Sequence, residues 1–154
     1  MNDYYYTTSY ETTYTSTDPA VAAGIAAFFI FFYLVLIAAI YVVSAIFLGK
    51  LFKKAGVPSW IAWVPFYNSW KMLEIGGQQG FWAVLAIIPI VSIVSLVFHF
   101  IAMYHIGLKL GKSGAFVVLG IFLPIVWLIW LAVDKSKWNE KAAGAAPSLH
   151  KPVA

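Results

Sequence analysis

The chain has 154 residues, of which 62% are hydrophobic and 10% are charged, a balance far from that of an ordinary soluble domain. Its net charge is +4, but the lysines stand at the ends of apolar runs, whereas nucleic-acid-binding proteins gather basic residues on one exposed face. With no cysteine, disulfides and thiolate metal sites are excluded. These features predict an all-α integral membrane protein that contacts membrane lipids and no nucleic acid.

The first 19 residues differ in composition from the rest of the chain. They are rich in tyrosine and threonine, and apart from Met1 they contain no large aliphatic side chain. A segment without core-forming side chains is predicted to be a disordered tail. It ends at Asp18 and Pro19, which favour a helix start because aspartate caps free N–H groups and proline suits the first helical position.

Three apolar runs predict a membrane domain over residues 20–133 with three transmembrane helices. Residues 20–49 contain no charged residue and would form a helix about 45 Å long, more than the ~30 Å hydrocarbon core. The second span covers residues 81–107 with a kink at Pro89, and the third covers residues 115–133 with a bend near Pro124. Residues 134–154 mix charges with alanine and proline and are predicted to be a disordered C-terminal tail.

A polar and aromatic stretch, residues 60–75, lies between the first two runs. Its aromatic side chains recur at three- and four-residue steps, and rings with a polar edge prefer the level where hydrocarbon meets water. Because the stretch also holds a lysine, a glutamate and a proline, we expect one interfacial or re-entrant helix rather than a span. Its candidate partner-contact residues are Trp60, Trp63, Tyr67 and Asn68.

The second apolar run carries three polar side chains on one face. Ser92, Ser95 and His99 lie within about 60° of one another around a helix. Unpartnered polar groups are costly in hydrocarbon, so we expect this face to turn toward another helix. The three residues are candidates for interhelical or partner contacts.

The lysines predict an orientation in the membrane. With three spans, Lys109 and Lys112 fall on one side, and the other eight lysines fall on the opposite side. Lysine excess marks the cytoplasmic face, so we expect the N-terminus outside and the C-terminus in the cytoplasm. If residues 60–75 crossed the membrane as well, the division would be five against five.

Motifs for catalysis and cofactor binding are weak. Gly111-Lys112-Ser113 resembles the end of a phosphate-binding loop, but that motif requires a glycine where this chain has Ile106. His99 and His105 lie about 240° apart around a helix, which excludes one shared metal on a single face. Ser95 and His99 lack the nearby acid that a hydrolytic triad needs. We expect no cofactor, no metal and no catalytic residue.

Three segments together carry a resemblance: AGVPSWIAWVPFYNSWKMLEIGG, GFWAVLAIIPIVSIV and GLKLGKSGAFVVLGIFLPIV. Over about residues 45–133 they resemble a family of small multi-pass prokaryotic membrane proteins known only as a domain of unknown function, sometimes joined to signal peptidase I. The matching positions are Gly56, Trp60, Pro65, Tyr67, Asn68, Gly76, Trp82, Pro89, Gly111, Lys112, Phe116, Gly120 and Pro124. Ser92 stands where the family usually has asparagine. The resemblance implies a multi-pass membrane fold and assigns no activity.

The function predicted from these observations is that of a non-enzymatic accessory or scaffolding subunit of a membrane complex, in secretion or envelope assembly. A protein partner or further copies of the chain would contact the aromatic stretch and the polar face of the second run, in a prokaryotic plasma membrane. One alternative is a homo-oligomeric channel or small-solute carrier that uses His99. A weaker alternative is an intramembrane hydrolase that uses Ser95.

Overall fold

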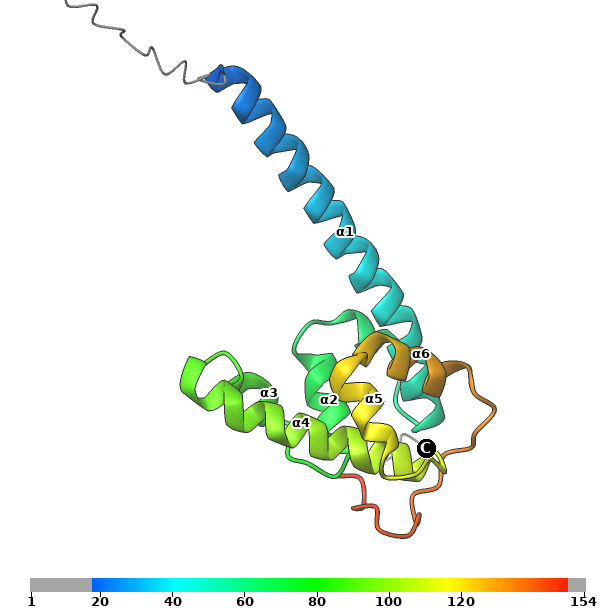
Figure 1. The fold of residues 1–154 in the computed structure, drawn as a ribbon. Coiled ribbons are helices and arrows are strands. Elements are labelled where there is room, and N and C mark those ends of the chain that lie inside the picture. The colour runs from blue at the N-terminus through cyan, green and yellow to red at the C-terminus, as the bar shows by residue number, and fades with distance from the viewer. Residues whose placement is uncertain (1–17, 150–154) are drawn as a thin grey trace, which may run out of the picture. The chain divides into compact units, whose positions relative to one another are not determined.

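The structure, a computed structural model, describes residues 18–149 and is all-helical over that range, without a β-strand (Figure 1). This confirms the all-α prediction. In chain order the elements are α1 (Pro19–Lys54), the 3₁₀ helix η1 (Ser59–Trp63), α2 (Tyr67–Ile75), α3 (Trp82–Leu85), α4 (Pro89–Lys109), α5 (Phe116–Phe122) and α6 (Pro124–Val133). The predicted N-terminal tail, apart from its last two residues, lies outside the described range, and so do residues 150–154.

The chain divides into two units, residues 1–38 and residues 39–154. In the first unit, the Asp18 carboxylate accepts a 2.9 Å hydrogen bond from the Ala20 N–H, and the helix begins at Pro19 as predicted. The described residues of this unit are exposed throughout and belong to the helical stretch that precedes Ala39. The second unit contains the hydrophobic core and all the elements that follow α1.

Proline interrupts each later apolar run. Pro89 and Pro124 stand at the first positions of α4 and α6, and Pro65 separates η1 from α2. Proline has no N–H to donate and its ring clashes with the preceding turn, so a helix restarts at proline more readily than it continues through it. The predicted kinks are therefore complete breaks.

The prediction of three transmembrane helices is corrected to two helices that are long and apolar enough to cross a bilayer, α1 with 36 residues and α4 with 21. The second predicted span shortens to α4, because residues 81–88 form the separate turn of α3 and its connection. The third splits into α5 and α6 with 7 and 10 residues. At 1.5 Å per residue they extend about 10 and 15 Å, short of the ~30 Å hydrocarbon core.

The core joins the C-terminal ends of three helices. Leu51 and Phe52 of α1, Ile106 of α4, and Trp127 and Leu131 of α6 are buried in one cluster. Further members of the same cluster come from η1, from α2, from α4 and from the loops that follow α1 and α4: Val57, Ile61, Ala62, Ile75, Met103 and Leu110. The last turns of α1, α4 and α6 therefore lie together.

Contacts of Lys112 and Lys54 with the end of α6 are incompatible with the three-span division of the lysines. Lys112, just after α4, forms an ion pair with Asp134, just after α6, and the Lys54 ammonium donates to the Leu131 carbonyl at 2.7 Å and to the Asp134 carbonyl. The three-span topology placed Lys112 on the opposite side from the other two residues. Because α5 and α6 form a hairpin that returns to its starting point, all three lie at the same end of the second unit.

The C-terminal segment is ordered where the structure describes it, contrary to the predicted disorder of residues 134–154. The Asn139 N–H donates to the Lys109 carbonyl at 2.8 Å, and the Leu149 N–H donates to the Glu74 carbonyl at 2.9 Å. Residues 134–149 thus run across the ends of α4 and α2. We call them the C-terminal strap.

Candidate functional site

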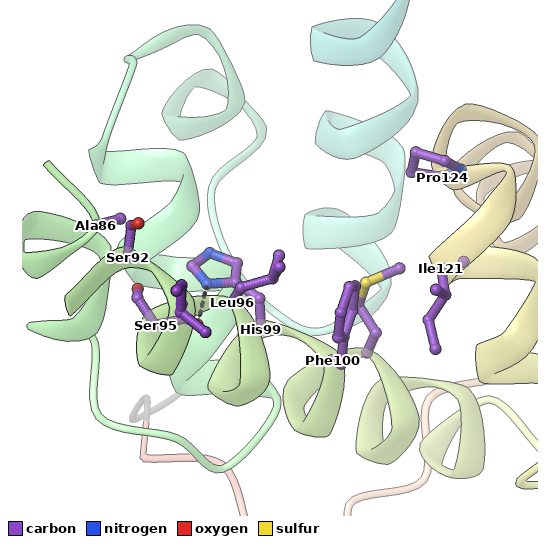
Figure 2. Close-up of a pocket in the computed structure, with 11 residues that line it drawn as sticks. Ala86, Ser92, Ser95, Leu96, His99, Phe100, Ile121 and Pro124 are labelled. Atoms are coloured by element: carbon purple, nitrogen blue, oxygen red, sulfur yellow. Dashed lines mark hydrogen bonds between the residues drawn. The ribbon is translucent and has the colours of Figure 1, made fainter. Parts of the chain in front are cut away.

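The polar face predicted on the second apolar run lines a groove beside α4 (Figure 2). Its volume is about 610 Å³ and its wall is mostly apolar. One side is the face of α4, and the other is the α5–α6 hairpin around its turn. The lining residues are Ala86, Ser92, Ile93, Ser95, Leu96, His99, Phe100, Met103, Gly120, Ile121 and Pro124. We call it the α4 groove.

Glycine lets the two sides of the groove approach. A Cβ at Gly120 would overlap the Met103 side chain and lie 3.1 Å from the Trp127 ring. The break between Phe122 and Pro124 then turns α6 away from the line of α5. Gly120 and Pro124 are both among the positions that carry the family resemblance described above.

Ser92, Ser95 and His99 do share one face, as predicted. Ser95 is fully buried, and its hydroxyl donates to the Trp82 carbonyl of α3. Ser92 donates to the Pro89 carbonyl at 2.6 Å, and His99 Nδ1 lies 3.0 Å from the Ser95 carbonyl. Only Ser95 therefore makes the predicted bond to another helix, while the other two bond within α4.

The partly buried His99 ring has one nitrogen left for another molecule. Because a carbonyl can only accept, Nδ1 carries the proton of the neutral imidazole, and Nε2 is then an acceptor. Within the described part of the chain, no hydrogen bond reaches Nε2. The groove wall also lacks a carboxylate, and the Ser95 hydroxyl is held by Trp82 rather than by His99. This arrangement suits binding rather than acyl transfer, which needs an activated nucleophile.

The predicted aromatic residues form a separate surface. Trp60 is 61% exposed and Trp63 is 47% exposed, and neither lines the α4 groove. The Trp60 and Tyr67 rings lie 6.3 Å apart, and the Tyr41 hydroxyl of α1 donates to the Trp63 carbonyl at 2.6 Å. Asn68 instead has a structural contact, a 3.2 Å hydrogen bond from its amide to the Ala62 carbonyl.

A strained turn separates the two halves of the aromatic stretch. Phe66 has φ 63° and ψ −43°, and the Tyr67 N–H donates to the Pro65 carbonyl at 2.7 Å. These values define a γ-turn, a rare conformation for a residue with a side chain. The predicted single helix over residues 60–75 is therefore two short helices, with the exposed Phe66 ring at the turn between them. On α2, Lys71 and Glu74 form an ion pair at 2.6 Å.

A buried lysine, Lys109, which lies just beyond the predicted second span, holds the end of α4. The Lys109 side chain is 0% exposed, and its ammonium bonds the Ile75 carbonyl at 2.8 Å, Glu140 at 3.0 Å and the Ser148 hydroxyl at 2.8 Å. The Trp138 ring lies 5.3 Å away. In the sequence, the position of Lys109 between Leu108 and Leu110 could have indicated its burial, because a charge among apolar side chains needs partners.

Both strap acids that pair with lysines stay ionised. The hydrogen bond from Lys112 lowers the pKa of Asp134 below its usual value. Partial burial raises the pKa of Glu140, but hydrogen bonds from Ser148, Trp138 and Lys109 outweigh that effect, and the net shift is downward. The strap is thus held by charged pairs at neutral pH.

The comparisons with known proteins place the chain in a family. Residues 60–141, more than half of the chain, match the model of a family of unknown function, DUF5684. The chain belongs to this family. Within this DUF5684 match lie the whole α4 groove, the α5–α6 hairpin and the Lys109–Glu140 pair, whereas α1 precedes it. No curated protein and no solved structure matches the chain.

Proposed function

We propose that this DUF5684 protein is a non-enzymatic integral membrane protein, an accessory or scaffolding subunit whose α4 groove receives an apolar transmembrane helix of a partner protein. The single observation that carries the proposal is the unbonded Nε2 of His99 in a mostly apolar groove, whose two serine hydroxyls already donate to backbone carbonyls, along a helix long enough to cross a bilayer.

The exposed side chains favour placement in a membrane. Large apolar residues are exposed along both long helices, such as Phe29 at 63% on α1 and Ile90 at 84% on α4. In water these surfaces would form an apolar patch far larger than monomeric soluble proteins carry, whereas lipid tails solvate them. We place the protein in a prokaryotic plasma membrane, with the N-terminus outside and with the lysine-bearing ends of α1, α4 and α6 and the C-terminus in the cytoplasm.

The occupant of the groove is a polypeptide helix rather than a lipid tail alone. A lipid tail fills apolar volume but cannot donate a hydrogen bond to His99 Nε2, and an unpartnered polar atom in hydrocarbon is costly. A helix with a serine, threonine or asparagine at the contact can donate that bond while its apolar side chains face Leu96, Phe100 and Ile121. Secretion or envelope assembly is the process we assign to the complex.

His99→Leu is the direct test, because leucine fills a similar volume and removes both ring nitrogens, including Nε2. The complex purified in a mild detergent should lose about fivefold in affinity, the effect of one interhelical hydrogen bond of about 1 kcal/mol. Val94→Leu is the matched control, since Val94 is 45% exposed on α4 and does not line the groove. Equal recovery of the partner with both variants would refute the proposal.

A variant that fills the α4 groove tests whether the partner needs the space in it. Ser92→Phe puts a ring into the groove without touching the buried Ser95 bond, so membrane insertion should persist while the partner is lost. Insertion with normal partner recovery would count against helix docking in the groove. If the His99 effect appeared instead as loss of solute flux through vesicles, without any co-purifying protein, the channel alternative would replace the scaffold.

A further inference from the structure

The place where α1, α4 and α6 end gathers most of the positive charge of the chain. The Lys54 contacts with Leu131 and Asp134 and the Lys112–Asp134 ion pair bring the three ends together. Segments 50–54, 109–112 and 134–141 hold eight of the ten lysines but only two of the six acidic residues. Both of those acids, Asp134 and Glu140, already pair with a lysine.

Five of these lysines are exposed and have no acidic partner within hydrogen-bond reach among the described residues. Lys50 and Lys53 lie on the last turns of α1. Lys135, Lys137 and Lys141 lie on the C-terminal strap, which the buried Lys109 holds against the helix ends. We call these five residues the lysine face.

We infer that the lysine face binds the anionic headgroups of phospholipids on the side of the membrane where α1, α4 and α6 end. The inference rests on the membrane placement proposed above, but not on the α4 groove. Lysines just beyond apolar helices lie at headgroup depth, where each attracts an anionic leaflet with an effect of about fivefold in affinity. The Lys50 ammonium lies 5.1 Å from the centre of the Phe47 ring, so its stem covers the last apolar turn of α1.

The fold holds the backbone of the C-terminal strap, and with it three of the five lysines, in a fixed position. The strap carries its lysines on backbone fixed by the Asn139 N–H bond to the Lys109 carbonyl. The backbone that carries these lysines therefore does not have to be ordered when lipid binds. The entropic cost of binding is lower than it would be for a free tail. The same fixed geometry makes the headgroup contact two-sided, from α1 and from the strap.

Lipid selection by the full-length protein tests the inference. The protein is dispersed in a mild detergent with equal amounts of phosphatidylglycerol and phosphatidylcholine, and the lipids that it retains are counted by native mass spectrometry. The wild type should retain phosphatidylglycerol in excess. Lys135→Gln, and then Lys137→Gln and Lys141→Gln in addition, should lower that excess stepwise toward the input ratio, by about fivefold for each lysine at low salt.

Lys71→Gln is the control, because Lys71 pairs with Glu74 in α2 and lies outside the lysine face. Its lipid ratio should match that of the wild type. A wild-type ratio equal to the input, or a loss with Lys71→Gln as large as with Lys135→Gln, would overturn the inference while leaving the membrane placement intact. A protein that retains neither lipid would contradict the membrane placement itself.

Discussion

At the scale of single residues, the feature that most constrains this protein is the Lys109 ammonium. It is removed from water, and its charge is balanced by one carboxylate, one hydroxyl and one carbonyl. Removing only one partner of a buried ion pair is more damaging than removing the buried charge, because the remaining charge stays desolvated. Glu140 is 43% exposed at its side chain, so it is rehydrated easily when Lys109 is lost.

This asymmetry predicts which of two substitutions lowers the folding stability more. Glu140→Gln should destabilise the fold by about 3 kcal/mol, whereas Lys109→Met should cost about 1–2 kcal/mol, since methionine fills the space without a charge. The measurement is denaturant unfolding in detergent, with Lys141→Gln as the control for loss of an exposed strap charge. If Lys109→Met proved the more damaging, the ammonium would be stabilising beyond its desolvation cost, contrary to this account.

The strap acids also predict how stability depends on pH. The pKa of Glu140 and that of Asp134 are lowered on folding, so their contributions are fully present above their unfolded pKa values and are lost as pH falls through the folded ones. The stability gap between the wild type and Glu140→Gln should therefore be constant near neutral pH and shrink as pH falls below the unfolded pKa of Glu140. Unfolding curves at each pH measure it, and a gap that widens in acid would exclude the lowered pKa.

At the scale of helices, close approach depends on small residues. A Cβ at Gly76, the residue after α2, would overlap the backbone of Ala102 on α4, whereas a Cβ at Gly24 on α1 would meet nothing within 4 Å. Gly76→Ala should thus destabilise the protein by about 1–3 kcal/mol through overpacking. Gly24→Ala should be neutral or stabilising by up to about 1 kcal/mol, because alanine favours helix. Thermal unfolding in detergent compares the two, and equal effects would contradict the packing of α2 on α4.

Local sequence chemistry accounts for several of the elements. The helix start at Asp18, the shared face of the α4 groove and the breaks near prolines follow from local chemistry, and each was predictable to within a few residues. Whether Pro124 bends a span or turns the chain back is decided by Lys112 and Asp134, which pair across 22 positions. The γ-turn at Phe66 and the burial of Lys109 depend likewise on distant contacts that no local pattern contains.

At the scale of the whole molecule, the return of the α5–α6 hairpin decides the topology. Ser113 precedes the hairpin and Ala143 lies on the strap after it, both exposed. The chain has no cysteine, so each can be replaced singly by cysteine and labelled in sealed vesicles with a membrane-impermeant maleimide. Both should be labelled from the same side, whereas a third span between them would put them on opposite sides.

The central claim is that a partner helix binds in the α4 groove. Site-specific photo-crosslinking in native membranes tests it most directly. A photoreactive phenylalanine analogue at Ile93, which lines the groove, should give a discrete protein adduct that disappears when Ser92→Phe fills the groove. The same probe at Val94, about 100° away around α4, should give lipid adducts only. Equal adducts at both positions, or only lipid at Ile93, would contradict a groove that receives a partner helix.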